Sequence, residues 1–272
     1  MTHATAPRPV SLVTGASSGL GAAFAERLAR DHHDLILVAR RRDRLENLAQ
    51  LFKTEHSIEV EVIPADLTVP DQLRRVERRI EAGPALATLV NNAGFGGYMP
   101  FLDLDVDRAE DLVRLQVLAV TRLTHAALPP MIAAGRGSVI NVSSRLAFSA
   151  PLPSPPLPKR ATYAATKAYV NTFTQLLASE LEGTGVRIQA LCPGVVRTEF
   201  HQVVGVDPSS LPAHIVMSPE DVVTASLTGL ERGEVICVPT LEDSDMLARI
   251  EDAQRQFFEH TRTGTLAQRY KA

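Results

Sequence analysis

Short apolar runs alternate with longer helical patterns along almost the whole chain, and this alternation restricts the fold more than any other feature of the sequence. The apolar runs lie at 10–14, 35–39, 60–64, 86–90, 138–142, 186–191 and 235–239. Several are apolar on both faces, as expected for parallel strands buried inside a sheet. Strict alternation within one domain predicts an α/β fold: a doubly wound parallel sheet of about seven strands with helices on both faces.

The bulk composition is that of an ordinary folded domain. The chain has 272 residues, 45% hydrophobic and 22% charged, and no repeat or linker-like stretch divides it, so we expect a single domain over 1–272. A net charge of −3 offers no general attraction to nucleic acid or to an anionic membrane, and neither is an expected partner. No apolar run reaches transmembrane length and the N-terminus lacks signal-peptide regions, which favours a cytoplasmic protein.

The spacing of cysteine and histidine argues against two further kinds of site. Cys192 and Cys237 show no CxxC spacing and lie in strand-like apolar runs, so we expect both to be reduced thiols of the core. The eight histidines form no HxxxH or HExxH pattern, which argues against a protein-bound metal.

A glycine-rich turn, Thr14-Gly-Ala-Ser-Ser-Gly-Leu-Gly21, follows the first apolar run and leads into a helical pattern. Glycines permit a tight turn and close approach of a ligand to the backbone, and a helix N-terminus presents free N–H groups to a pyrophosphate. The spacing G-x3-G-x-G differs from the standard dinucleotide turn, and a purely structural turn has a similar composition. The position after the first strand favours a nucleotide site containing Gly15, Ser17, Ser18, Gly19, Leu20 and Gly21.

Three arginines, Arg40 to Arg42, follow the second apolar run, and no acid precedes Asp43. An NAD site usually has an Asp or Glu at this place to bind the ribose hydroxyls. Arginine binds a 2′-phosphate through charge-assisted hydrogen bonds, so the pattern favours NADP(H), with Arg40 as the first contact and Arg41 as the next. The alternative is a basic helix start, which the helix dipole disfavours.

With these motifs in order, the chain resembles the short-chain dehydrogenase/reductase (SDR) family in its single-domain, Rossmann-like form. The TGxxxGxG turn is followed by Asp66-Leu67, Asn91-Asn92-Ala93-Gly94, Ser143-Ser144, Tyr163-x3-Lys167 and Pro193-Gly194, and the match covers about 9 to 240. The resemblance implies that Asp66 contacts the adenine, that Leu67 lies beside it, and that Asn92, Ala93 and Gly94 line the cofactor channel, whereas Asn91 ties the central strand together. Pro193, Gly194, Val196 and Thr198 would position the nicotinamide carboxamide.

Tyr163 and Lys167 lie four residues apart in a helical pattern, so they project from one face of that helix. A free phenol, with a pKa near ~10, is a poor acid–base group at neutral pH. A neighbouring ammonium, together with the positive nicotinamide of the oxidised cofactor, favours the phenolate and lowers that value. We expect Tyr163 to exchange a proton with a carbonyl or alcohol oxygen, and Lys167 to tune it and hold the nicotinamide ribose. By resemblance Ser144 stabilises the same oxygen, with Ser143 as the second candidate.

One position departs from the family pattern. The family commonly has an Asn in the helix before the fifth strand, where it binds a water that leads to the catalytic Lys, and this chain has Gln116 there. Because Gln keeps the amide but adds a methylene, the proton relay could be preserved, shifted or weakened.

The leading function is therefore an NADP(H)-dependent oxidoreductase of the carbonyl reductase type, acting on a ketone or secondary alcohol. A dehydratase or epimerase without net redox chemistry and a cofactor-sensing regulatory protein are the alternatives. The expected lid, 195–217, and Phe95 and Tyr98 suggest an apolar small-molecule substrate, although part of this set could belong to the core. Within the lid, His201 could contact substrate or lie on the surface. The resemblance also implies a homodimer or homotetramer formed by long helices near 105–133 and 161–182.

Five prolines crowd positions 151–158, between the expected catalytic serine and tyrosine. The family commonly separates these two residues by thirteen positions, so the larger separation here indicates an insertion of about six residues. Prolines fix φ and remove backbone donors, so loop 145–160 must run over the surface. It could form one wall of the substrate cleft, or it could be a spacer without ligand contact.

Overall fold

The computed structural model describes residues 7–155, 157–200 and 211–271. It divides into two units, Met1–Pro239 and Thr240–Ala272. Among the described residues, no helix is both long enough and apolar enough to span a membrane.

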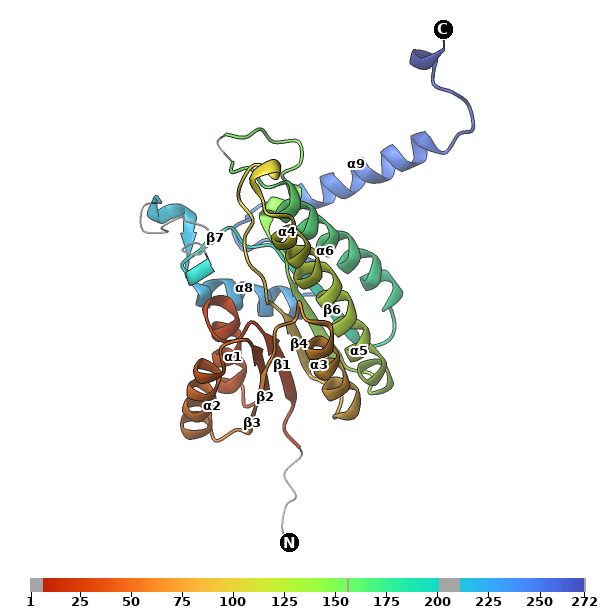
Figure 1. Cartoon of the computed structure of the whole chain (residues 1–272). Helices are drawn as coiled ribbons and strands as arrows, with labels where there is room; N and C mark the ends of the chain where they lie inside the picture. Colours follow the sequence, from red (N-terminus) through yellow and green to blue (C-terminus); the bar gives the residue numbers. More distant parts are fainter. Residues whose placement is uncertain (1–6, 156, 201–210, 272) are drawn as a thin grey trace. The chain divides into compact units, whose positions relative to one another are not determined.

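The first unit contains a parallel sheet of seven strands in the order β3-β2-β1-β4-β5-β6-β9 (Figure 1). Each run of small and branched apolar residues that predicts a strand forms one, which confirms the predicted α/β class. The strands are β1 (Val10–Thr14), β2 (Asp34–Ala39), β3 (Val60–Pro64), β4 (Thr88–Asn91), β5 (Gly137–Val142), β6 (Val186–Leu191) and β9 (Ile236–Cys237).

Helices cover both faces of this sheet, and successive strand residues point to opposite layers. Leu12 and Ile36 belong to the apolar cluster under one layer, whereas Val13 and Leu37 belong to the other. The first layer consists of α3 (Pro70–Ala82), α5 (Val120–Ala133) and α6 (Ala161–Glu180), and the second of α1 (Gly19–Arg30), α2 (Arg42–His56) and α8 (Pro219–Glu231) (Figure 1). Because helices cover both faces of the sheet, a ligand site is expected at the edge where the carboxyl ends of the strands lie.

The long helix expected near 105–133 is not uniform. It consists of α4 (Val106–Val113), a π-helical segment (Arg114–Ala119) and α5. A π-helical segment adds a residue to the turn, and such segments occur frequently at functional sites. Gln116 lies within it and is buried.

Strands β1 and β4 are neighbours in the sheet although they are not consecutive in the chain. The order of the strands reverses between them, and in such folds the ligand cleft forms outside the carboxyl ends at this point. The glycine-rich turn and the Asn91–Gly94 segment therefore face each other. A separate two-stranded sheet, β7 (Val195–Val196) with β8 (Val216–Met217), begins and ends the expected lid.

The second unit contains α9 (Asp245–Thr261) and no buried side chain among its described residues. Its apolar residues recur at helical spacing, at Met246, Ile250, Phe257 and Phe258, and all four are exposed. The prediction of one domain over 1–272 assigned this segment no role of its own.

Candidate active site

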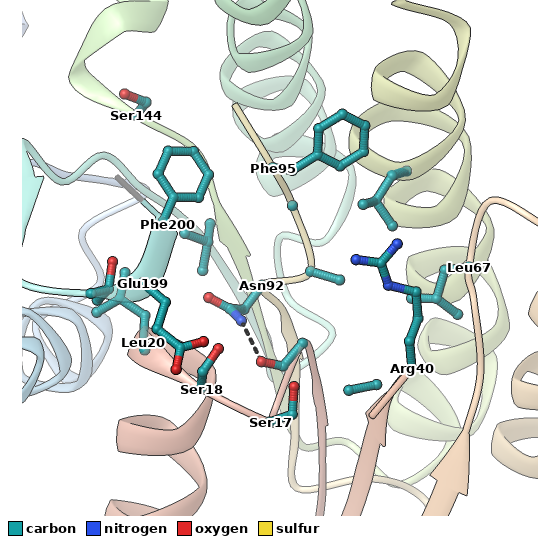
Figure 2. Close-up of a pocket in the computed structure, with 18 of the residues that line it drawn as sticks. Ser17, Ser18, Leu20, Arg40, Leu67, Asn92, Phe95, Ser144, Glu199 and Phe200 are labelled. Atoms are coloured by element: carbon teal, nitrogen blue, oxygen red, sulfur yellow. Dashed lines mark hydrogen bonds between the residues drawn. The ribbon is translucent and has the colours of Figure 1, made fainter. Parts of the chain in front are cut away.

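The glycine-rich turn is held against the Asn92 segment by close backbone contacts. Gly15 has φ +66°, and a Cβ on Gly21 would lie 2.3 Å from the Gly15 carbonyl oxygen and 2.5 Å from Asn92 Nδ2, so no side chain fits at 21. Asn92 Nδ2 donates to the carbonyl oxygens of Thr14, at 2.9 Å, and Gly15, at 3.4 Å. Figure 2 shows the Asn92 amide pointing toward this turn. The Thr14 hydroxyl accepts the backbone N–H of Asn92 at 2.9 Å.

The helix that follows this turn offers free donors to an anion. No side chain caps the N-terminus of α1 at Ser18, and its first turn contains no acidic residue. Uncapped N–H groups and the positive end of the helix dipole bind phosphate groups. The residues present therefore fit the pyrophosphate of a dinucleotide.

Both arginines expected to bind a 2′-phosphate lie at the end of this cleft. Arg40 reaches Asp66 at 3.8 Å and is largely exposed. Arg41 donates to Ser17 Oγ at 3.1 Å and to Ser18 Oγ at 2.6 Å. These bonds attach Arg41 to the glycine-rich turn that is expected to bind phosphate (the phosphate turn). The two serines and Arg41 therefore lie together beside the glycines.

Ser144, Tyr163 and Lys167 are brought together by β5 and α6, and all three are buried. Lys167 Nζ lies 5.7 Å from the centre of the Tyr163 ring and donates to the Val142 carbonyl at 2.8 Å. The Ser143 hydroxyl donates to the Lys167 backbone carbonyl at 3.0 Å and so joins β5 to α6. This bond engages Ser143 in structure and favours Ser144 as the serine that acts on substrate.

The balance of effects on Tyr163 differs from the sequence-based expectation. In the folded chain, burial raises the pKa of Tyr163, and hydrogen bonding to Tyr98 and Ser144 opposes this rise only in part. Burial also lowers the pKa of Lys167 to about 8, against an ordinary value of 10.5. Burial of the phenol therefore dominates the Tyr163 pKa in the folded chain, and Lys167 is not among its causes. The lowering expected from Lys167 together with the oxidised nicotinamide stays a prediction.

Tyr98 supplies a second phenol to the site. Its ring meets the Tyr163 ring edge-on with 5.0 Å between centroids, and Phe200 lies 6.3 Å from Tyr98 and 6.2 Å from Tyr163. Burial is the main cause that raises the pKa of Tyr98, so this phenol stays protonated and can donate to Tyr163. The sequence placed Tyr98 near substrate, but nothing in the sequence indicates its bond to Tyr163.

Gln116 is bonded both to the loop that carries Phe95 and Tyr98 and to helix α6. Its Nε2 donates to the Phe95 carbonyl at 2.7 Å, and the Thr166 hydroxyl lies 3.0 Å from its Oε1. Arg108 stacks on the Phe95 ring with 5.0 Å to the centroid. The side chain of Gln116 therefore joins two segments that both contribute residues to one pocket.

One pocket collects almost the whole predicted set of site residues. Gly21 and Gln116 do not line it, because Gly21 packs against the turn and Gln116 lies beneath the surface. Glu199, which also lines the pocket, lies within the expected lid but was given no role of its own. Asp111 and Leu115 line the pocket and were not predicted, since no motif contains them. The predicted residues that line it are Gly15, Ser17, Ser18, Gly19, Leu20, Arg40, Arg41, Asp66, Leu67, Asn92, Ala93, Gly94, Ser144, Tyr163, Lys167, Pro193, Gly194, Val196 and Thr198.

The proline-rich loop is fixed by one buried arginine at the start of α6. Arg160 donates to the Ser149 hydroxyl and carbonyl, both at 2.7 Å, and to the carbonyls of Leu152 and Pro158, both at 2.9 Å. Of the described residues in 145–160, Leu146 packs in the apolar cluster around Tyr163, whereas none lines the pocket. Residues 201–210 of the expected lid, His201 among them, lie outside the described residues.

This fold and site define a dinucleotide-dependent oxidoreductase, and comparisons with known proteins give the family. The profile of the short chain dehydrogenase family matches residues 9–208, and the chain belongs to this family. The family binds NAD(P)(H), and the arrangement described above fits that cofactor.

Two solved structures and a curated relative are similar over most of the chain. A short-chain dehydrogenase from Sphingobium yanoikuyae in complex with NADPH is 37% identical, with a TM-score of 0.89, covering 96% of this chain and 100% of that one. A bulky-bulky ketone specific alcohol dehydrogenase from Comamonas testosteroni is 33% identical, with a TM-score of 0.87, covering 97% and 99%. The very-long-chain 3-oxoacyl-CoA reductase of Mus musculus is 32% identical over 71% of this chain, and the match spans only 61% of that relative.

Proposed function

We propose that the protein is an NADP(H)-dependent oxidoreductase that interconverts a ketone and a secondary alcohol, with Tyr163 as general acid and base. The observation that carries this proposal is the convergence of Tyr163, Ser144 and Lys167 on one pocket that also contains the phosphate turn. NADP(H) when bound would supply or accept a hydride at its nicotinamide ring.

The roles of the side chains follow from their positions. Tyr163 gives its phenolic proton to the substrate oxygen during reduction, and Ser144 hydrogen-bonds the same oxygen and stabilises its developing charge. Tyr98 donates to the Tyr163 oxygen and so favours the phenolate that remains. Lys167, held at the Val142 carbonyl, directs its positive charge toward the Tyr163 ring.

A preference for NADP(H) over NAD(H) is part of the proposal. Arg40 and Arg41 provide two cations at the end of β2, and Ser17 lies within hydrogen-bond distance of Arg41. Asp66 pairs with Arg40 at 3.8 Å, and it follows β3, whereas the acid that binds ribose hydroxyls in NAD sites lies at the end of the second strand.

The substrate we propose is an apolar ketone with bulk on both sides of the carbonyl. Phe95, Tyr98 and Phe200 pack with Tyr163, and Leu104 and Leu112 close the apolar cluster behind them. Aromatic walls favour flat or bulky apolar groups through area burial. The Comamonas testosteroni relative, described as specific for bulky-bulky ketones, supports the same class.

The proposal includes a homodimer or homotetramer and a cytoplasmic location. Exposed apolar side chains on the π-helical segment and α6, Leu118, Tyr169 and Leu176, support assembly through the long helices. Both cysteines are free and buried, in keeping with a reducing compartment.

Replacing Tyr163 with Phe tests the function. Because the ring and its packing remain while the proton donor is lost, we expect turnover of bulky ketones to fall by about 10²-fold or more, with NADPH binding retained. Oxidation of NADPH is followed by absorbance, and binding by quenching or calorimetry. Tyr270→Phe, which removes an exposed phenol that does not line the pocket, is the matched control and should keep its rate.

Retained ketone reduction in Tyr163→Phe would contradict the proposal. Turnover of a substrate without any net change in NADPH absorbance would instead support the dehydratase or epimerase alternative. Binding of NADPH without turnover of any ketone or alcohol in the unaltered protein would support the regulatory alternative.

A further inference from the structure

Glu199 makes two ion pairs across the entrance to the cofactor site. Its Oε2 lies 2.9 Å from Arg41 Nη1, and its Oε1 lies 2.7 Å from Arg44 Nη1. The two oxygens therefore bind two different arginines at the start of α2, and hydrogen bonding from both lowers the pKa of Glu199. Figure 2 shows the carboxylate close to Ser18, at the edge of the phosphate turn.

Arg41 has a position that also suits a phosphate. Besides Glu199 it contacts the hydroxyls of Ser17 and Ser18, at 3.0 Å and 2.6 Å from its Nη2. Carboxylates and phosphates are bound by arginine in the same way, through charge-assisted bonds to a planar fork. The carboxylate of Glu199 therefore binds Arg41 in the same way as a phosphate group on the adenosine ribose would.

We propose that Glu199 is a specificity-determining residue: it occupies the Arg41–Arg44 pair as an internal substitute for the 2′-phosphate and gives way to that phosphate when NADP(H) binds. The inference depends on the proposed function only through the location of the cofactor site. It concerns recognition of the adenosine end and does not depend on which substrate is reduced.

The chain around Glu199 connects this exchange to the substrate pocket. Thr198, on one side, lies against Gly19 of the phosphate turn, where a Cβ would approach it to 3.1 Å. Phe200, on the other side, packs with Tyr98 and Tyr163. Adjacent Cα atoms are only ~3.8 Å apart, so three consecutive residues, with Glu199 in the middle, connect the phosphate turn to the aromatic side chains around Tyr163. A cofactor without the 2′-phosphate does not compete for these arginines.

Glu199→Gln tests the inference by direct binding. Glutamine keeps the shape of the side chain but loses the charge that competes with a phosphate. The probes are 2′,5′-ADP and 5′-AMP, which differ only in the 2′-phosphate, measured by isothermal titration calorimetry on the full chain. Because the pairs are partly exposed and individually weak, we expect 2′,5′-ADP to bind about three- to tenfold more tightly to the variant, with 5′-AMP unchanged.

Glu46→Gln is the matched control. Glu46 pairs with Arg42 at 3.2 Å on the same helix, so its neutralisation removes one negative charge from the same region without touching Arg41 or Arg44. The ratio of the two affinities should stay that of the unaltered protein.

Two outcomes would overturn the inference. Weaker binding of 2′,5′-ADP to Glu199→Gln would show that Glu199 holds the arginines ready for the phosphate rather than competing with it. Equal tightening for both probes would show a general charge effect. Because neither measurement needs turnover, both outcomes are distinct from a failure of the proposed carbonyl chemistry, which only the ketone assay reports.

Discussion

Lys167, for which we propose a role in the reaction, has a charged group in a buried position, and this burial is energetically unfavourable. Its side chain is buried, and burial lowers its pKa from 10.5 to about 8. At neutral pH the folded chain therefore holds a charged ammonium with its single described hydrogen bond to the Val142 carbonyl. Such groups are retained at functional sites because the chemistry requires them, at the expense of stability.

Lys167→Met should make the protein inactive but more stable at neutral pH. Below pH 8 both the folded and the unfolded lysine are charged, and the variant lacks the cost of burying that charge, on the order of 3 kcal/mol before the lost hydrogen bond is counted. Between pH 8 and 10.5 the unfolded chain binds more protons than the folded chain, so the unaltered protein gains stability as pH rises. The difference between the two proteins should narrow across this window.

Urea unfolding at several pH values measures this difference directly. Lys53→Met, on the exposed side of α2, is the control for the loss of a surface lysine and should show only a small difference in the free energy of unfolding. A constant gap for Lys167→Met across the window would mean that the buried lysine does not carry the predicted charge.

At the scale of elements, a feature could be predicted from the sequence when the interactions that cause it lie between neighbouring residues. Strand positions follow from runs such as Leu35–Ala39, and the helix start at Ser218 follows from its side chain, which accepts the Asp221 N–H at 3.0 Å. The Tyr163–Lys167 spacing likewise lies within one helix. These features need only neighbouring residues, and the structure contains them.

Features that depend on distant contacts could not be predicted. Gln116, in the π-helical segment, bonds to Phe95 and Thr166, which are 21 and 50 positions away. Glu199 pairs with Arg41 across 158 positions, and no pattern around either residue indicates the partner. The pKa of Tyr163 is raised mainly by burial, and the Tyr–Lys spacing alone does not specify how deeply the phenol is buried.

The proline-rich loop is the element whose anchoring most directly invites a test. Arg160→Met removes the guanidinium and leaves the carbonyls of Ser149, Leu152 and Pro158 without this donor. We expect the free energy of unfolding to fall by about 1–3 kcal/mol. If the loop forms a wall of the cleft, KM for a bulky ketone should rise while the Kd for NADPH stays unchanged, because Arg160 does not line the cofactor pocket.

Steady-state kinetics and NADPH titration separate the two roles of the loop. Lys159→Met, an exposed neighbour, is the control and should leave KM and stability as they are. An unchanged KM in Arg160→Met, together with the loss of stability, would assign the loop to the spacer role.

At the scale of the whole molecule, the stability of the first unit should not depend on the residues after Pro239. The residues of the three apolar clusters all lie in this unit, and the last of them is Cys237. In the second unit the described side chains are exposed or half-exposed, including the apolar residues of α9. Burial of apolar area is the main source of folding free energy, so we expect the three clusters of the first unit to be sufficient for its stability.

A chain ending at Pro239 should therefore unfold at nearly the same temperature as the full chain when both are monomeric. For a protein of this size a change of 1 kcal/mol shifts the midpoint by roughly 2–4 °C, so a shift within that range is expected. Calorimetry at low protein concentration, with light scattering to establish the mass, provides the measurement. A much larger fall would show that residues 240–272 pack on a core, and if it occurs only in the assembled state, that core belongs to a second copy of the chain.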